Sequence, residues 1–269
     1  MTYNVRNNNQ AGFTLVELAI VLMIIGLLIG GVLRGQEMMQ NARVNHMVRQ
    51  IQSYQAALVT FQDTYSQLPG DMVNPSARIP NCAASTDCGA SGNGDGLIGR
   101  YDGPMAAPIV MTTGREENRT VWLHLANAHL ISGIDLAAPF SASEANFGTH
   151  FPGTPWAVGG FHMVSYTAPN GFSLSTGQTG GASRGRSGVH LFVTNSPANV
   201  VTFHSPEVIS ATLTPREAAM IDRKMDDGLM YSGAVQAAGP DCQGGTGWSE
   251  VPYKEDNPLR SCSMVIFIQ

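Results

Sequence analysis

The sequence predicts an α+β protein in which one long N-terminal helix, half of it transmembrane, packs on an antiparallel β-sheet in a loop-rich, disulfide-containing body. Three observations predict this fold. Residues 18–33 form an unbroken apolar run, and residues 44–65 repeat apolar side chains at helical spacing. The rest of the chain holds short strand signals separated by turns, with Gly 30 and Pro 15 among 269 residues.

Composition narrows the functional classes. Acidic residues outnumber basic ones by 20 to 15, which gives a formal net charge of −5 and predicts no nucleic-acid surface. The four cysteines, Cys82, Cys88, Cys242 and Cys262, are even in number and show neither CxxC nor HxxxH spacing. They therefore favour disulfides, and an oxidising compartment, over a zinc site.

The apolar run is long enough to cross a bilayer. Extended back to Phe13, it covers residues 13–33 and is interrupted only by Thr14 and Glu17, a length of roughly 30 Å as a helix. An ordinary secretory signal peptide is disfavoured, because the first twelve residues hold one arginine and no small-x-small cleavage site follows. A carboxylate in hydrocarbon costs at least ~2.5 kcal/mol, so we expect Glu17 to meet a cation.

The segment Gly12-Phe13-Thr14-Leu15-Val16-Glu17, followed by this run, resembles the N-terminus of type IV prepilins and of type II secretion pseudopilins. The resemblance implies that a membrane-embedded aspartyl prepilin peptidase cleaves between Gly12 and Phe13 and methylates the new amino terminus. It also implies that Glu17 pairs with the Phe13 amine of a neighbouring subunit during filament assembly. The expected cation is then supplied by another copy of the chain.

The resemblance also implies an organisation and a location. We expect a cleaved leader at residues 1–12, a transmembrane and filament-core half of the helix at 13–35, an amphipathic half at 36–68, and a globular α+β head at 69–269. Before assembly the chain would be a single-pass inner-membrane protein with a cytoplasmic N-terminus and a periplasmic body. It would then enter an extracellular pilus or a periplasmic pseudopilus. The three arginines after the run, against one before it, favour the opposite orientation by the positive-inside count; we follow the family topology.

The amphipathic half is marked by apolar residues spaced three and four apart, namely Val44, Met47, Ile51, Tyr54, Leu58, Phe61 and Tyr65. The helix is expected to end near Leu68, because the following Pro69 disfavours helix at and before its own position. A parallel coiled coil is the alternative, but only three heptads are present. We therefore predict that this stripe packs on a sheet.

The segment from residue 72 to about 102 is rich in turns and contains Cys82 and Cys88, whose bridge would close a short loop. Asn93 and Asp95 alternate with glycines and resemble part of an oxygen-ligand calcium loop, and calcium sites occur in some pseudopilins. The bidentate glutamate of a complete loop is absent, so a plain Asx-Gly turn is the favoured interpretation and calcium the weaker one. No other cofactor is expected.

Further elements are predicted along the body. A short helix is expected over residues 119–131, where His124 and His129 lie five apart and do not indicate a metal site. Strands are expected at 156–166 and 172–175, joined as a hairpin, and at 189–194, 200–203 and 264–268. Thr214 and Pro215 predict the start of a helix that ends by Gly228.

Two sequence features bear on the remaining sites. Cys242 and Cys262 bracket the position where type IV pilins commonly carry a C-terminal disulfide-closed loop, although four cysteines allow three pairings. Ser183 lies in a G-x-S-x-G peptide, but loop residues flank it where a nucleophile elbow needs a strand and a helix. We therefore predict no enzyme.

The resemblance implies a structural subunit of a type IV pilus-like filament. Its expected partners are copies of itself, other pilin-like subunits, prepilin peptidase, an inner-membrane assembly platform and, before assembly, membrane lipid. A pseudopilin of a type II secretion system, or a minor, priming or ligand-binding pilin, is the alternative, because a body of about two hundred residues is large for an abundant pilin. A membrane-anchored periplasmic enzyme is the third possibility.

Overall fold

The structure, a computed structural model, describes residues 14–83, 86–99, 109–110, 117–138, 146–166, 187–195, 199–200, 211–239, 241–245 and 251–269. Contacts between residues divide the chain into two compact units, residues 1–43 and 44–269. The first helix, α1 (Leu15–Tyr65), supplies nearly all of the described part of the first unit and the opening segment of the second.

The second unit is an α+β body built around a four-stranded antiparallel sheet. Its strands lie in the order β2-β3-β6-β5, with β2 at Gly160–Tyr166, β3 at Gly188–Thr194, β6 at Ser263–Phe267 and β5 at Val235–Ala238. Register places Met163 opposite Leu191, and Leu191 opposite Ile266. A separate two-stranded pair joins β1 (Ile109–Val110) to β4 (Asn199–Val200). The antiparallel sheet predicted from the sequence is confirmed.

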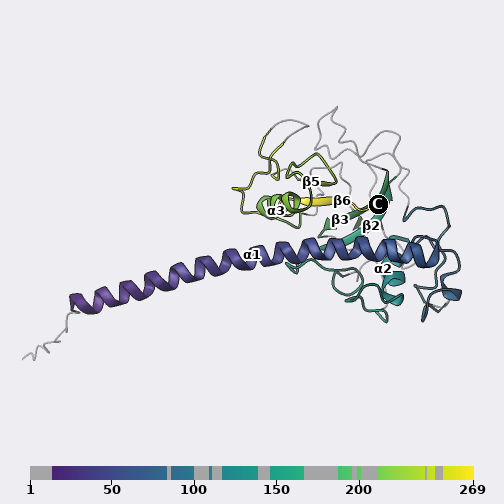
Figure 1. Cartoon of the computed structure of the whole chain (residues 1–269), viewed down its shortest axis with the longest axis horizontal. Helices are drawn as coiled ribbons and strands as arrows, with labels where there is room; N and C mark the ends of the chain where they lie inside the picture. The colour runs from purple at the N-terminus through teal and green to yellow at the C-terminus, as the bar shows by residue number, and fades with distance from the viewer. Residues whose placement is uncertain are drawn as a thin grey trace, which may run out of the picture. The chain divides into compact units, whose positions relative to one another are not determined.

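The stripe on the second half of α1 forms one wall of the core. Val44, Met47, Ile51, Leu58 and Phe61 are fully buried, as predicted from their spacing. Figure 1 shows this half of α1 running beside the sheet. The helix therefore packs on its own body, which accounts for the stripe without a coiled coil.

Aromatic side chains join α1 to the sheet and to the second helix, α2 (Glu117–Asn127). The Tyr54 ring meets Trp122 of α2 edge-on at 5.1 Å and Phe161 of β2 at 5.3 Å, measured between ring centroids. Such edge-to-face pairs are each worth about 1 kcal/mol beyond the area they bury. Tyr54 is therefore the point where three elements meet.

The segment that follows α1 turns sharply and passes close to α2. The helix stops at Tyr65, Ser66 takes a left-handed backbone, and the 3-10 helix η1 (Pro75–Ala77) follows in the next loop. Gly70 also has a positive φ of 88°, and a side chain there would meet the Glu117 carbonyl oxygen. Only glycine allows both the backbone angle and this approach.

The third helix, α3 (Pro215–Met225), begins where Thr214 and Pro215 predict. The Thr214 side chain accepts a hydrogen bond from the Glu217 N–H, and the Glu217 carboxylate accepts one from the Thr214 N–H, which forms a complete capping box. The helix contacts β5 at the edge of the sheet. The helix predicted over 119–131 is also present, as α2, and ends four residues earlier.

The predicted strands differ from the observed ones in extent and pairing. Strand β2 begins at Gly160 rather than at residue 156, because residues 155–158 form a turn. It pairs along its whole length with β3, and the predicted hairpin partner at 172–175 lies outside the described residues. Residues 201–203 of another predicted strand also lie outside them, and β5 was not predicted.

Candidate functional site

The N-terminal part of α1 exposes an unusual amount of apolar surface. Among the described residues, α1 is the helix that is long and apolar enough to cross a membrane. The mean hydropathy of its most apolar segment is 2.7. None of that segment is buried by the rest of the chain. Large aliphatic side chains such as Leu15, Met23 and Leu27 are more than three-quarters exposed. A surface of this kind needs lipid or other helices around it.

Glu17 is held at the first turn of this helix by Thr14. The Thr14 backbone N–H and its hydroxyl both donate to Glu17 Oε2 at 2.9 Å, and the Glu17 N–H donates to Thr14 Oγ1 at 3.2 Å. This is the reciprocal pattern of a capping box, which satisfies helix N-terminal donors that otherwise have no partner. The carboxylate is thereby fixed at the N-terminal end of the helix.

Gly12 and Phe13, the predicted cleavage and methylation positions, lie outside the described residues, as does Ser183. The predicted pairing of Glu17 with a Phe13 amine therefore stays a prediction. Further along the helix, a side chain added at Gly26, Gly30, Gly31 or Gly35 would meet nothing within 4 Å. These glycines leave the backbone open to close approach by another helix.

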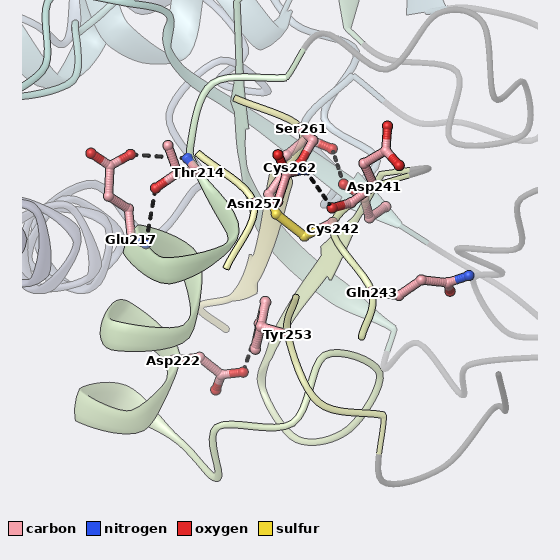
Figure 2. Close-up of a disulfide and its surroundings, with 12 residues drawn as sticks. Thr214, Glu217, Asp222, Asp241, Cys242, Gln243, Tyr253, Asn257, Ser261 and Cys262 are labelled. Carbon is pink, nitrogen blue, oxygen red and sulfur yellow. Dashed lines mark hydrogen bonds between the residues drawn. A yellow bond between two sulfur atoms is a disulfide. The ribbon is translucent and has the colours of Figure 1, made fainter. Parts of the chain in front are cut away.

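The four cysteines form two disulfides in the body, as their number predicted. Cys82 is bonded to Cys88 and Cys242 to Cys262, with Cα–Cα distances of 5.3 and 5.2 Å. The second bond joins the segment after β5 to the start of β6, so it ties the C-terminal loop to the sheet (Figure 2). Of the three possible pairings, the structure has the one between sequence neighbours.

The segment with Asn93 and Asp95 folds around the carboxylate of Asp71, which no sequence pattern marks as part of a site. Asp71 accepts hydrogen bonds from the backbone N–H groups of Gly94, Asp95 and Gly96 at 2.7, 3.1 and 2.8 Å. Burial raises the pKa of Asp71, against the effect of these donors. The backbone of this loop is therefore held by hydrogen bonds to Asp71, which lies in the segment after α1.

The side-chain oxygens of Asn93 and Asp95 are already used within this loop. Asn93 Oδ1 accepts the Asp95 N–H at 2.9 Å, and Asp95 Oδ1 accepts the Leu97 N–H at 3.0 Å. These contacts are those of the Asx turns that the sequence favoured. Calcium binding there stays a prediction, and it would require these oxygens to exchange hydrogen bonds for metal bonds.

Neutral His124 connects three segments of the body. Its Nδ1 accepts the Gly70 N–H at 2.9 Å, its Nε2 lies 3.0 Å from the Cys88 carbonyl oxygen, and its ring stacks on Phe61. Nδ1 is the acceptor, so the proton is on Nε2, which donates to Cys88. Burial lowers the pKa of His124 to about 4. His129 is exposed and is not part of this arrangement.

A buried carboxylate joins α3 to the C-terminal disulfide loop. Asp222 accepts a hydrogen bond from the Tyr253 hydroxyl at 2.8 Å, as Figure 2 shows, and another from the Gly228 N–H. Burial raises the pKa of Asp222 to about 7, with nearby Asp226 and Asp227 adding to the shift. No local sequence signal marks this contact, because Tyr253 lies 31 residues further along the chain.

The described residues thus define an α+β protein with a membrane-length helix at its N-terminus, a carboxylate fixed in the first turn of that helix, and a disulfide-bonded body. The comparison with family models identifies the N-terminal segment further. Residues 7–33 match the prokaryotic N-terminal methylation motif, which is consistent with the type IV pilin and pseudopilin family. The resemblance drawn from GFTLVE is therefore confirmed for this segment, and the fold is pilin-like. No curated protein and no solved structure matches the chain.

Proposed function

We propose that this chain is a structural subunit of a type IV pilus-like filament, processed between Gly12 and Phe13 and assembled through its N-terminal helix. The observation that carries the proposal is the methylation motif at residues 7–33, placed directly on an apolar helix that its own body leaves uncovered. The motif points to a structural subunit rather than to an enzyme. The helix and the motif together fit membrane anchoring before assembly.

The position of Glu17 supports assembly through this helix. Thr14 satisfies one carboxylate oxygen, Oε2, and orients the group toward the helix N-terminus. A methylated amine keeps its positive charge, so the Phe13 amine of a neighbour would offset a carboxylate that hydrocarbon does not tolerate alone. Helix packing between subunits would cover the aliphatic side chains of residues 15–33, with close approach at the glycines.

The second candidate function is a pseudopilin of a type II secretion system or a minor pilin. The size of the body favours it, since the second unit extends from residue 44 to residue 269 and carries several loops. In this case the same helix and the same processing would serve a short periplasmic filament or a filament tip. The two candidates differ in abundance and location rather than in assembly chemistry.

Mass spectrometry of sheared surface filaments and of inner membranes distinguishes these candidates. An N-terminally methylated peptide beginning at Phe13, abundant in the sheared fraction, is expected for a major pilin. The same peptide confined to membranes would indicate a pseudopilin or a minor subunit. An uncut Met1 terminus would refute the proposal in both forms.

Substitution of Glu17 tests the assembly step separately from processing. We expect Glu17→Val to be cleaved normally but to give few or no filaments, because the amine of the neighbouring subunit loses its partner. Glu37→Val is the matched control, since Glu37 lies outside the apolar run, is exposed, and pairs with Arg34 three residues away. Normal filaments from Glu17→Val would exclude the pairing, and efficient cleavage of a Gly12→Leu variant would exclude the cleavage site.

A further inference from the structure

The body contains a cavity of about 410 Å³ beside the second half of α1. Its wall is formed by Gln50 and Tyr54 of α1, by Ser132 and Gly133, and by residues between 147 and 159. Each of these described lining residues is uncharged. The volume falls in the range of small-molecule sites, so the lining decides which ligand fits.

Gln50 and Tyr54, which both line this wall, carry an acceptor and a donor that have no partner among the described residues. Gln50 Nε2 donates to the Tyr54 hydroxyl at 2.8 Å and to the Gly153 carbonyl oxygen at 2.9 Å, which distinguishes the nitrogen of the amide from its oxygen. Gln50 Oε1 is buried and accepts no hydrogen bond from the described residues. A buried acceptor without a partner costs about 1–3 kcal/mol, so a ligand that donates to it gains that energy back.

Tyr54 adds the complementary donor. Burial raises its pKa to about 12, so the hydroxyl keeps its proton, and the oxygen already accepts from Gln50. No acceptor for this proton is found among the described residues. A single ligand hydroxyl can both donate and accept, and therefore matches the pair that Gln50 and Tyr54 present.

The rest of the lining favours a ligand without charge. A carboxylate, phosphate or ammonium group would find no opposite charge among the described lining residues to offset its desolvation. Phe147 and Pro152 give apolar surface against which the C–H face of a ring can pack. A compact molecule with several hydroxyls and an apolar face meets all of these conditions.

We propose that this cavity binds one pyranose ring, free or as a residue of a glycan, with a ligand hydroxyl bridging Gln50 and Tyr54. Oε1 itself is covered, so binding requires the Gln50 amide to turn and give up its hydrogen bond to Gly153, which a hydrogen bond from the ligand hydroxyl to Oε1 replaces. The proposal is independent of filament assembly, because all residues of the site lie in the second unit.

The test is saturation-transfer NMR on the full chain in lipid nanodiscs, which avoid sugar-based detergents, with D-glucose, D-galactose and N-acetyl-D-glucosamine as separate probes. We expect saturable binding of at least one of them, in the millimolar range. Gln50→Ala should weaken it about tenfold. Gln52→Ala, on the exposed side of the same helix, is the matched control and should bind like the unaltered chain.

A second variant blocks the cavity without removing a hydrogen-bonding group. A Cβ at Gly153 would lie 3.6–4.0 Å from Gly148 and Gly159, two other lining residues, so it points inward without a clash. Gly153→Leu should abolish binding while its circular dichroism and melting temperature stay close to those of the unaltered chain. Absence of saturable binding by all three sugars, or equal binding by Gly153→Leu, would overturn the proposal and indicate a cavity filled by water only.

Discussion

His124 shows how much one residue contributes to holding the body together. It lies on α2, yet its two ring nitrogens contact Gly70 in the segment after α1 and Cys88 in the first disulfide loop. A protonated ring would place two N–H donors where the structure has one donor and one acceptor. Acid should therefore loosen the junction of these three segments.

The pH dependence follows from the lowered pKa of His124. Above pH 6.5 both the folded and the unfolded states hold it neutral, so it contributes no pH dependence there. Between pH 6.5 and about 4 only the unfolded state binds the proton, and the free energy of unfolding falls as pH falls, by up to about 3 kcal/mol. Urea unfolding of the full chain in detergent at several pH values measures this loss.

Other groups with shifted pKa values, including Asp71 and Glu117, titrate in the same range, so variants are needed to isolate His124. Burial also lowers the pKa of His190 to about 4, with the same sign of effect. Asp222, with its pKa raised to about 7, acts oppositely, because its contribution is lost as pH rises from 3.8 toward 7. His124→Gln should flatten the profile between pH 6.5 and 4, whereas exposed His129→Asn should not. An unchanged slope in His124→Gln would contradict the assignment.

At the scale of elements, α3 depends on its first turn. The Thr214–Glu217 capping box is supported by Arg260, which lies 3.2 Å from the Glu217 carboxylate and belongs to the C-terminal disulfide loop. The N-terminus of α3 is thus tied to the loop that Cys262 closes. The cap serves the helix and its attachment to the sheet at once.

Removal of the Thr214 hydroxyl is expected to cost about 1 kcal/mol of unfolding free energy, within the range of about 0.5–2 kcal/mol for N-caps. The reason is that the Glu217 N–H loses its acceptor in the first turn of α3. Denaturant unfolding of Thr214→Ala measures the loss, and Thr214→Ser, which keeps the hydroxyl, should behave like the unaltered chain. A loss of equal size in both variants would mean that the methyl group, not the cap, stabilises this turn.

The elements that the sequence predicted well are those with local signals. The stripe on α1 and the N-cap of α3 depend on residues three or four positions apart, and both are present. Strand β5 has four residues, of which Ala237 and Ala238 carry little strand preference, so only its pairing with β6 defines it. Strand β2 pairs with β3, and the partner expected next to β2 in sequence, at residues 172–175, lies outside the described residues.

The candidate sites also differ in whether their contacts join residues that are close in sequence or distant. Threonine three residues before Glu17 is the spacing of a capping box, so the Thr14 contact has a signal in the sequence. The role of Asp71 was not visible, because its three donors lie 23 to 25 residues away. The contact between Asp222 and Tyr253 was not visible either, because 31 residues separate them. Contacts of this kind are set by how segments pack, which short-range patterns do not encode.

At the scale of the whole molecule, two disulfides constrain different parts of the body. The Cys82–Cys88 bond closes a loop with a sequence separation of 6, and Cys242–Cys262 one with a separation of 20. On the chain-entropy estimate the longer loop restricts the unfolded state more, by about 3 kcal/mol against about 2 kcal/mol. The larger effect is therefore expected at the C-terminal bond.

Replacement of Cys242 and Cys262 by serine together should lower the free energy of unfolding by about 3 kcal/mol, and replacement of Cys82 and Cys88 by about 2 kcal/mol. Chemical denaturation of the two double variants, each compared with the intact chain, measures the difference. The first variant should also lose order in the segment between β5 and β6, seen as faster amide hydrogen exchange. A larger loss in the second variant would show that local packing around Cys88 outweighs loop entropy.

The boundary between the two compact units, after Arg43, predicts which part of the chain folds without a membrane. In the part of the chain that the structure describes, the buried apolar residues of the core lie at or after Val44, and the side chains of residues 14–39 are exposed. A fragment of residues 44–269 should therefore fold in water, form both disulfides and melt cooperatively.

A fragment of residues 69–269 is the informative comparison, because it lacks the wall formed by Met47, Ile51 and Phe61 and would leave the sheet uncovered. We expect it to aggregate or to lack a cooperative transition by circular dichroism. Equal stability of the two fragments would mean that the second half of α1 is not part of the core and serves only as a stalk.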